Sequence, residues 1–206
     1  MEGNLYITQN CLLEQGKAFR NGQEIFASEA KDAEGFLLSL YQDLGIKYPK
    51  FYKMDNLSKL GFLAGEMVLD NSSQANTYKS EDISIVLYNA NSSLDTDVRY
   101  YNTVREMASP ALFVYTLPNI LIGELCIRHK INGENLFFIQ EKFNAGDLHH
   151  YVEYLLHENI TQACLCGWVD CFGDQYKACL MWVEKKGEGQ PFTPDTINKI
   201  YNQGNG

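Results

Sequence analysis

The chain has 206 residues, of which 45% are hydrophobic and 21% charged, and its formal net charge is −9 at pH 7. This length and composition are typical of one globular domain with a substantial core. The negative charge argues against sequence-independent binding of nucleic acid, which requires a basic surface. It also disfavours a large docking face for an acidic carrier protein, because like charges slow the encounter.

Hydropathy and cysteine usage indicate a cytoplasmic protein. No apolar run approaches the roughly 18 residues that suggest a membrane span, and MEGNLYITQN lacks the basic and apolar regions of a secretory signal. Six cysteines lie mostly in apolar contexts, which predicts reduced, buried thiols. They are Cys11, Cys126, Cys164, Cys166, Cys171 and Cys179.

The predicted elements alternate between strands and helices. In chain order we expect a strand at Leu5–Thr8, a hairpin turning at Asn21-Gly22, and helices at Phe36–Leu44 and Asp55–Leu69. There follow a strand at Ile83–Tyr88, a helix at Val98–Met107, a helix opened by the stretch TLPN, a strand at Asn135–Phe138, a helix at Ala145–His157, and strands at Ala163–Val169 and Ala178–Val183. Gly61 and Gly65 lie four residues apart on one helix, which predicts close packing against another element.

Alternation of strands and helices predicts an α/β fold, with a mixed, mostly parallel five-stranded sheet covered by helices. The last two strands are too close for a crossover helix, so we expect them to be antiparallel. The residues from Lys185 onward are mostly polar. We therefore divide the chain into a domain at 1–184 and a polar tail at 185–206.

Several segments together resemble the N-terminal half of a β-ketoacyl synthase of the thiolase-like fold. The most specific is SPALFVYTLPNILIGELCIRHKINGEN, at 109–135. FYKMDNLSKLGFLAGEMVL, ISIVLYNANSSLDTD and AGDLHHYVEYLL are similar to other segments of that half-domain. The resemblance covers Leu5 to Glu184. More narrowly, the chain resembles the short, chain-length-factor-like proteins of aryl polyene and flexirubin pigment clusters.

Two departures from the family pattern bear on activity. Family members carry a nucleophilic cysteine between the strand and the helix that here are joined by FIQEKFNAG, which contains no Cys, Ser or Thr. The catalytic histidines and lysine of the family belong to a C-terminal half with no counterpart in these 206 residues. Condensation needs a thiolate and groups that stabilise an enolate. The resemblance therefore implies a non-catalytic subunit, and we expect no catalytic residue, cofactor or metal.

Four groups of residues could suggest a replacement site, but each favours a structural role. His149 and His150 begin a helix, where a solvent-facing or dimer-facing pair is the simpler interpretation. Cys164 and Cys166, with Cys171 nearby, lack the spacing of a structural zinc site.

The two remaining groups also favour structural roles. Asp95 and Asp97 do not match a calcium loop and favour capping and turn functions. Cys126, within the TLPN helix, favours packing over a role as a nucleophile.

The resemblance places a set of apolar and polar residues at an acyl tunnel or a dimer interface. After Ser109-Pro110 these are Ala111, Leu112, Phe113, Tyr115, Thr116 and Asn119, and on the next strand Leu136, Phe137 and Phe138. Bulky side chains at the bottom of a partner's tunnel would limit chain growth by overlap. Interface packing without such a limit needs the same residue types, so both interpretations stay open. The apolar strand suits an edge that is buried by pairing across a two-fold axis.

Three functions follow from this reading. The first is a chain-length-factor-type subunit that pairs with a full-length ketosynthase and meets the acyl carrier protein only indirectly. The second is a non-enzymatic homodimer that binds an acyl group or a protein. The third is an acyltransferase with a relocated thiol, which would require one unusually reactive cysteine.

Overall fold

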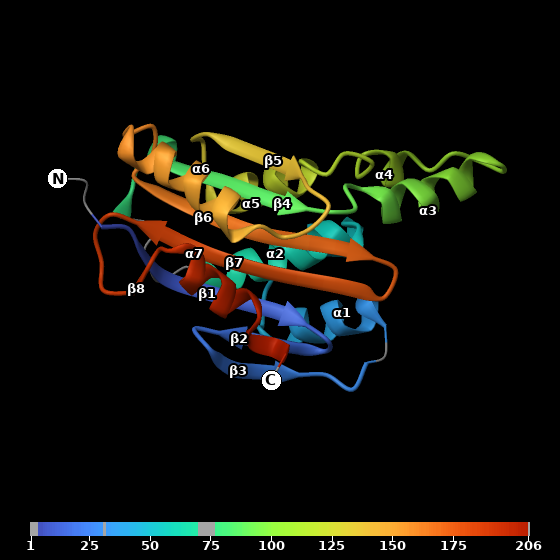
Figure 1. The fold of residues 1–206 in the computed structure, drawn as a ribbon. Helices are drawn as coiled ribbons and strands as arrows, with labels where there is room; N and C mark the ends of the chain where they lie inside the picture. Colours follow the sequence, from blue (N-terminus) through green and yellow to red (C-terminus); the bar gives the residue numbers. More distant parts are fainter. Residues whose placement is uncertain (1–3, 31, 70–76, 206) are drawn as a thin grey trace.

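The structure is a computed structural model that describes residues 4–30, 32–69 and 77–205. The first three residues of the N-terminal segment considered above lie outside this range. One sheet runs through the molecule, with helices on both faces (Figure 1). Its strands are β1 (Tyr6–Glu14), β2 (Lys17–Arg20), β3 (Gln23–Ala27), β4 (Ile83–Asn89), β5 (Asn135–Ile139), β6 (Ala163–Phe172), β7 (Gln175–Glu184) and β8 (Gln190–Pro191).

The helices are α1 (Ala33–Asp43), α2 (Asn56–Val68), α3 (Leu94–Val104), α4 (Pro110–Phe113), α5 (Ile120–His129), α6 (Ala145–His157) and α7 (Pro194–Tyr201). Short 3₁₀ turns are η1 (Pro49–Lys53), η3 (Ser80–Asp82) and η4 (Gln203–Asn205). The expected strands and helices are present, with boundaries shifted by a few residues. The TLPN stretch precedes α5 directly, and Asn119 is its N-cap residue.

The α/β class is confirmed, but the strand count and the direction of the strands were wrong. The described residues form an eight-stranded sheet in the order β3-β2-β1-β7-β6-β4-β5, with β8 pairing β1. Only β4–β5 and β4–β6 are parallel, and β6–β7 is antiparallel as predicted. The difference arises at β1, which continues to Glu14 through a register shift between Ile7 and Gln9. This bulge carries the strand past its polar residues and joins the β2–β3 hairpin to the sheet.

Two cores flank the sheet. On one face α1, α2 and α5 pack against the strands, with Phe36, Leu63 and Leu125 completely buried. On the other face α6 and α7 cover β1, β6 and β7, with Leu148, Val152 and others buried. The connection from β4 to β5 thus uses one face and the connection from β5 to β6 the other, as expected where helices cover both sides of parallel strands.

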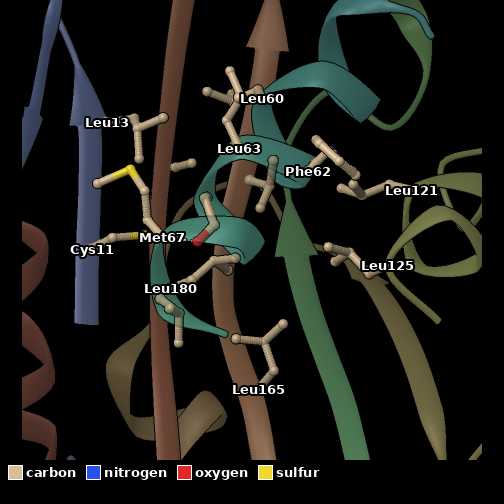
Figure 2. Packing of buried hydrophobic residues seen from close by; sticks show 14 of the residues in the cluster. Cys11, Leu13, Leu60, Phe62, Leu63, Met67, Leu121, Leu125, Leu165 and Leu180 are labelled. Carbon is tan, nitrogen blue, oxygen red and sulfur yellow. Dashed lines mark hydrogen bonds between the residues drawn. The ribbon is translucent and has the colours of Figure 1, made fainter. Parts of the chain in front are cut away.

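The predicted close packing at Gly61 and Gly65 is confirmed. A Cβ atom at position 61 would overlap the side chain of Leu121, and one at position 65 would overlap Leu125. Figure 2 shows these two leucines of α5 facing α2. The absence of side chains at the two glycines lets the helices approach, and the leucines fill the space.

The segment predicted as a polar tail contains a packed helix. The core between the sheet and helices α6 and α7 includes three buried residues of this segment, Phe192, Ile197 and Ile200. The spacing of Ile197 and Ile200 gives α7 one apolar face in a segment whose average composition is polar. Whether 184/185 is a domain boundary stays a prediction, but the segment is part of the fold.

Candidate functional site

Residues 93–117, which we call the arm, extend beyond the end of β4 (Figure 1). They comprise α3, α4 and the chain between and after these helices. The arm links β4 to α5 and contains the first nine residues, 109–117, of the segment with the strongest family resemblance.

Large hydrophobic side chains on the arm face outward. Sixteen such side chains are exposed among the described residues, and eight of them lie on the arm. The eight are Leu94, Val98, Tyr101, Val104, Met107, Phe113, Val114 and Leu117. This concentration in one segment is unlike the scattered exposed hydrophobic residues of an ordinary surface. The arm therefore has the character of an interaction surface.

The stripe on α3 has the spacing of a packed helix but no partner within the described chain. Leu94, Val98 and Tyr101 recur at helical spacing, yet they are 43%, 48% and 61% exposed. An amphipathic helix is normally stabilised by burial of its apolar face. Here that face is exposed.

The base of the arm is polar and buried. Its only buried side chains are Ser93, Thr96 and Tyr115. The Ser93 hydroxyl donates to the Thr116 carbonyl at 3.0 Å, and the Thr96 hydroxyl donates to an Asp55 carboxylate oxygen at 2.6 Å. The buried side chains of the arm thus all carry hydroxyl groups, whereas most of its large hydrophobic side chains are exposed.

Tyr115 joins the arm to α5 through a buried carboxylate. Its hydroxyl donates to Glu124 at 3.0 Å, and Lys50 forms an ion pair with the other oxygen of Glu124 at 2.7 Å. Burial and the adjacent Glu124 raise the pKa of Tyr115, so it remains a neutral donor. Burial likewise raises the pKa of Asp55.

The structure divides the predicted tunnel and interface residues of the arm into two groups. Ala111, Phe113 and Asn119 are exposed, whereas Leu112 and Thr116 are partly buried. Phe113 is 59% exposed, and its ring lies 5.4 Å from that of Tyr100. Tyr115 is buried and fixes the segment from inside. The exposed group is free to contact a partner, and its tunnel role stays a prediction.

The β5 residues lie at the end of the sheet. Among the described strands β5 pairs only with β4, so its outer edge is unpaired. Leu136, Phe137 and Phe138 are partly buried. Phe137 packs against the core of α2 and α5, while Phe138 stacks on Tyr88 in the other core. An unpaired apolar edge of this kind favours pairing with another chain.

Aromatic rings pack around the turn that replaces the family's nucleophile. Phe143 stacks on Tyr201 of α7 with ring centroids 4.0 Å apart, and it meets Trp168 edge-on. Asn144 caps α6 by accepting hydrogen bonds from the Gly146 and Asp147 amides. The cavity of about 430 Å³ beside this turn is lined by aromatic and charged side chains and contains no thiol.

The cysteines are free and five of the six are buried, as expected. Burial raises the pKa of Cys11 and of Cys171 to about 12, and it also raises those of Cys126, Cys166 and Cys179. These thiols are therefore the opposite of activated nucleophiles.

The remaining polar clusters take structural positions. Asp95 accepts from the Gly173 amide, which agrees with a turn function, and an Asp97 oxygen lies 3.2 Å from the Ser93 hydroxyl; no side chain in the described part of the chain caps the start of α3, so the capping function is not seen. His150 is exposed, whereas His149 stacks on Phe192. No three His, Cys, Asp or Glu side chains of the described residues converge as metal ligands. None of the helices in the described ranges is long and apolar enough to cross a membrane.

Sequence reasoning missed the polar base of the arm. Asp55, Glu124 and Lys50 are far apart in sequence, so no local pattern connects them. The apolar spacing of Leu94, Val98 and Tyr101 was visible, but spacing alone does not distinguish a core face from an exposed one.

No protein-family model matches the sequence, and no curated protein matches it either. Among solved structures, the chain is similar to the ishigamide ketosynthase/chain length factor, with a TM-score of 0.63 and 14% identity over 92% of this chain and 64% of that one. It is similar to the ketosynthase ApeO in complex with its chain length factor ApeC from Xenorhabdus doucetiae, with a TM-score of 0.59 and 13% identity over 97% of this chain and 90% of the other.

A third likeness is to AntDE:AntF, a type II PKS acyl-carrier protein in complex with its ketosynthase bound to the hexaketide, with a TM-score of 0.60 and 13% identity over 89% of this chain. The chain spans 64% of the length of the first and third matches, but almost the whole of the second. The chain thus has the fold of ketosynthase and chain-length-factor subunits, as the thiolase-like resemblance predicted.

Proposed function

We propose that the chain is a non-catalytic, chain-length-factor-type subunit that pairs with a full-length ketosynthase and shapes its acyl tunnel. The products would be polyene, polyketide or fatty-acid-like chains made in the cytoplasm. The observation that carries the proposal is the arm, because eight exposed hydrophobic side chains gather on it, and three of them, Phe113, Val114 and Leu117, lie in the segment that resembles the synthase dimer interface. Two of the similar structures are named for a ketosynthase together with a chain length factor, which supports this class of partner.

The lack of a nucleophile supports a non-catalytic role. The turn at 140–144 carries no thiol or hydroxyl, and burial raises the pKa values of five cysteines. In this proposal the ketosynthase supplies the reactive cysteine and the docking site for the carrier protein.

Pairing is tested first by recovering the tagged chain from its native host. We expect a stoichiometric ketosynthase, identified by mass spectrometry.

Tyr101→Asp on the arm should weaken that complex at least tenfold, since buried interface tyrosines commonly contribute about 2 kcal/mol or more. Tyr154→Asp is the matched control, because Tyr154 is 51% exposed on α6, away from the arm. Equal effects of the two substitutions would argue against the arm as the interface.

Tunnel shaping is a separate test on the same complex. Phe113→Ala and Leu112→Ala should lengthen the products by removing bulk at the tunnel end. Phe172→Ala, at an exposed site on β6, should leave product length unchanged. Unchanged lengths from stable Phe113 and Leu112 variants would leave the pairing intact but eliminate the steric limit.

The second candidate is a homodimer that binds an acyl group or a protein. The same observation supports it, because a second copy of the chain would also cover the exposed side chains of the arm and pair with the outer edge of β5. Recovery of a stable homodimer with no ketosynthase would favour it.

A further inference from the structure

The arm is attached to the domain in an unusual way, which the proposed interface does not by itself explain. Of residues 93–117, only Ser93, Thr96 and Tyr115 bury their side chains, and each of the three donates a hydroxyl hydrogen bond. The large hydrophobic side chains of the arm contribute little to this attachment because they face outward. The arm is thus attached by directional polar contacts, which include Asp95 accepting from the Gly173 amide, together with the Tyr115 ring, which belongs to the core of α1, α2 and α5.

Two of these hydroxyls have their partners on helices α2 and α5. Thr96 donates to Asp55, which also caps α2 by accepting from the Ser58 amide at 2.9 Å. Tyr115 donates to Glu124 on α5, and Lys50 balances the charge of that carboxylate. The two helices are in turn held together by the Gly61 and Gly65 contacts. One end of the arm is thus fixed to α2 and the other to α5.

The third hydroxyl closes the base of the arm. Ser93 stands at its start, and its hydroxyl reaches the Thr116 carbonyl at its end, 3.0 Å away. This bond joins the two chain segments that lead into and out of the arm. Together the three bonds define the direction in which the arm leaves the domain.

We propose that the hydroxyls of Ser93, Thr96 and Tyr115 are positioning groups that hold the arm in the orientation its partner recognises. This inference rests on the proposed pairing function. Hydrogen bonds are directional, whereas apolar contact is not, so a polar base specifies one orientation and leaves the hydrocarbon surface available. An interface ordered before binding loses less conformational entropy on association.

The experiment uses the full chain, with Tyr115→Phe and Thr96→Val as test variants. Each removes one hydroxyl and keeps nearly the same shape. We expect amide hydrogen exchange in 94–114 to become about tenfold faster, with exchange in the sheet unchanged, and binding to the ketosynthase to weaken about tenfold. Thr96→Ser retains the donor and should preserve both properties.

Tyr176→Phe is the matched control, since the Tyr176 hydroxyl accepts the Gly16 amide hydrogen bond at 2.8 Å, elsewhere in the core. It should leave exchange in the arm and partner affinity unchanged. The proposal is overturned if both test variants keep wild-type exchange in 94–114, or if they accelerate exchange in the sheet as much as in the arm. Exchange is measured on the free chain, so the positioning role is decided even if no ketosynthase binds.

Discussion

Apolar side chains are buried where α2 contacts α5, but they are exposed on the arm that leads into α5. At the contact, Leu121 and Leu125 fill the space left by two glycines and are completely buried. On the arm, Leu94, Val98 and Leu117 are roughly half exposed. The comparison shows that apolar spacing gives a helix one hydrophobic face, while the rest of the fold decides whether that face is covered.

Polar groups show the reverse distribution. The α2–α5 contact is closed at its edge by Glu66, which accepts two hydrogen bonds from Arg128 at 2.7 and 2.8 Å. The arm instead buries its polar groups at the base. The α2–α5 contact thus has an ion pair at its rim, whereas the arm has buried hydroxyl groups at its base.

The largest expected difference in the free energy of unfolding is between two leucine-to-alanine substitutions, one at the α2–α5 contact and one on the arm. Leu125→Ala should lower the free energy of unfolding by about 3 kcal/mol, because it removes a fully buried side chain and leaves a cavity. Leu117→Ala, at a site 58% exposed, should change it by less than about 0.5 kcal/mol. Urea unfolding of the free chain measures both. Similar losses for the two variants would show that the arm is packed against the domain in solution.

The next effect concerns Glu66 and is sensitive to pH. Burial opposes ionisation, but hydrogen bonds from Arg128 and His129 prevail and lower the pKa of Glu66 from 4.5 to about 2. A depressed pKa stabilises the fold above pH 4.5, and that stabilisation is lost as pH falls from 4.5 toward 2. Glu66→Gln should therefore cost about 2–3 kcal/mol at pH 7.

The difference between wild type and Glu66→Gln should shrink steadily below pH 4.5, as followed by urea unfolding at several pH values. A difference independent of pH would assign the loss to packing instead of charge. Glu153→Gln is a control on the exposed side of α6, where the nearest histidine nitrogens are 3.8 and 3.9 Å away.

The smallest effect compares two helical glycines. Gly61→Ala places a methyl group against Leu121 and should destabilise the chain by about 1–2 kcal/mol, despite the better helix propensity of alanine. Gly123→Ala meets no atom within 4 Å and should stabilise α5 by about 0.5–1 kcal/mol. Thermal unfolding of both variants gives the two signs. A stabilising Gly61→Ala would mean that Leu121 moves aside at little cost.

Local patterns in the sequence were sufficient for the elements and for the close helix contact. The β-branched run at 83–88 and the four-residue spacing of Gly61 and Gly65 each have one physical interpretation, and the structure confirmed both. The fold resemblance was also readable, because the segment from Ser109 to Asn135 keeps its characteristic residues in order. In contrast, β1 was predicted to end too early, since polar Gln9 and Asn10 interrupt its alternation and a bulge compensates.

The sequence by itself determined most of the helices and strands and which of their faces are apolar, because these properties depend on neighbours along the chain. Only the tertiary structure decided that the apolar face of α7 is buried and that of α3 is not. It also brought Asp55 to Thr96 and Glu124 to Tyr115. Those contacts depend on how distant segments meet in space, where burial and hydrogen bonding are settled jointly by the whole fold.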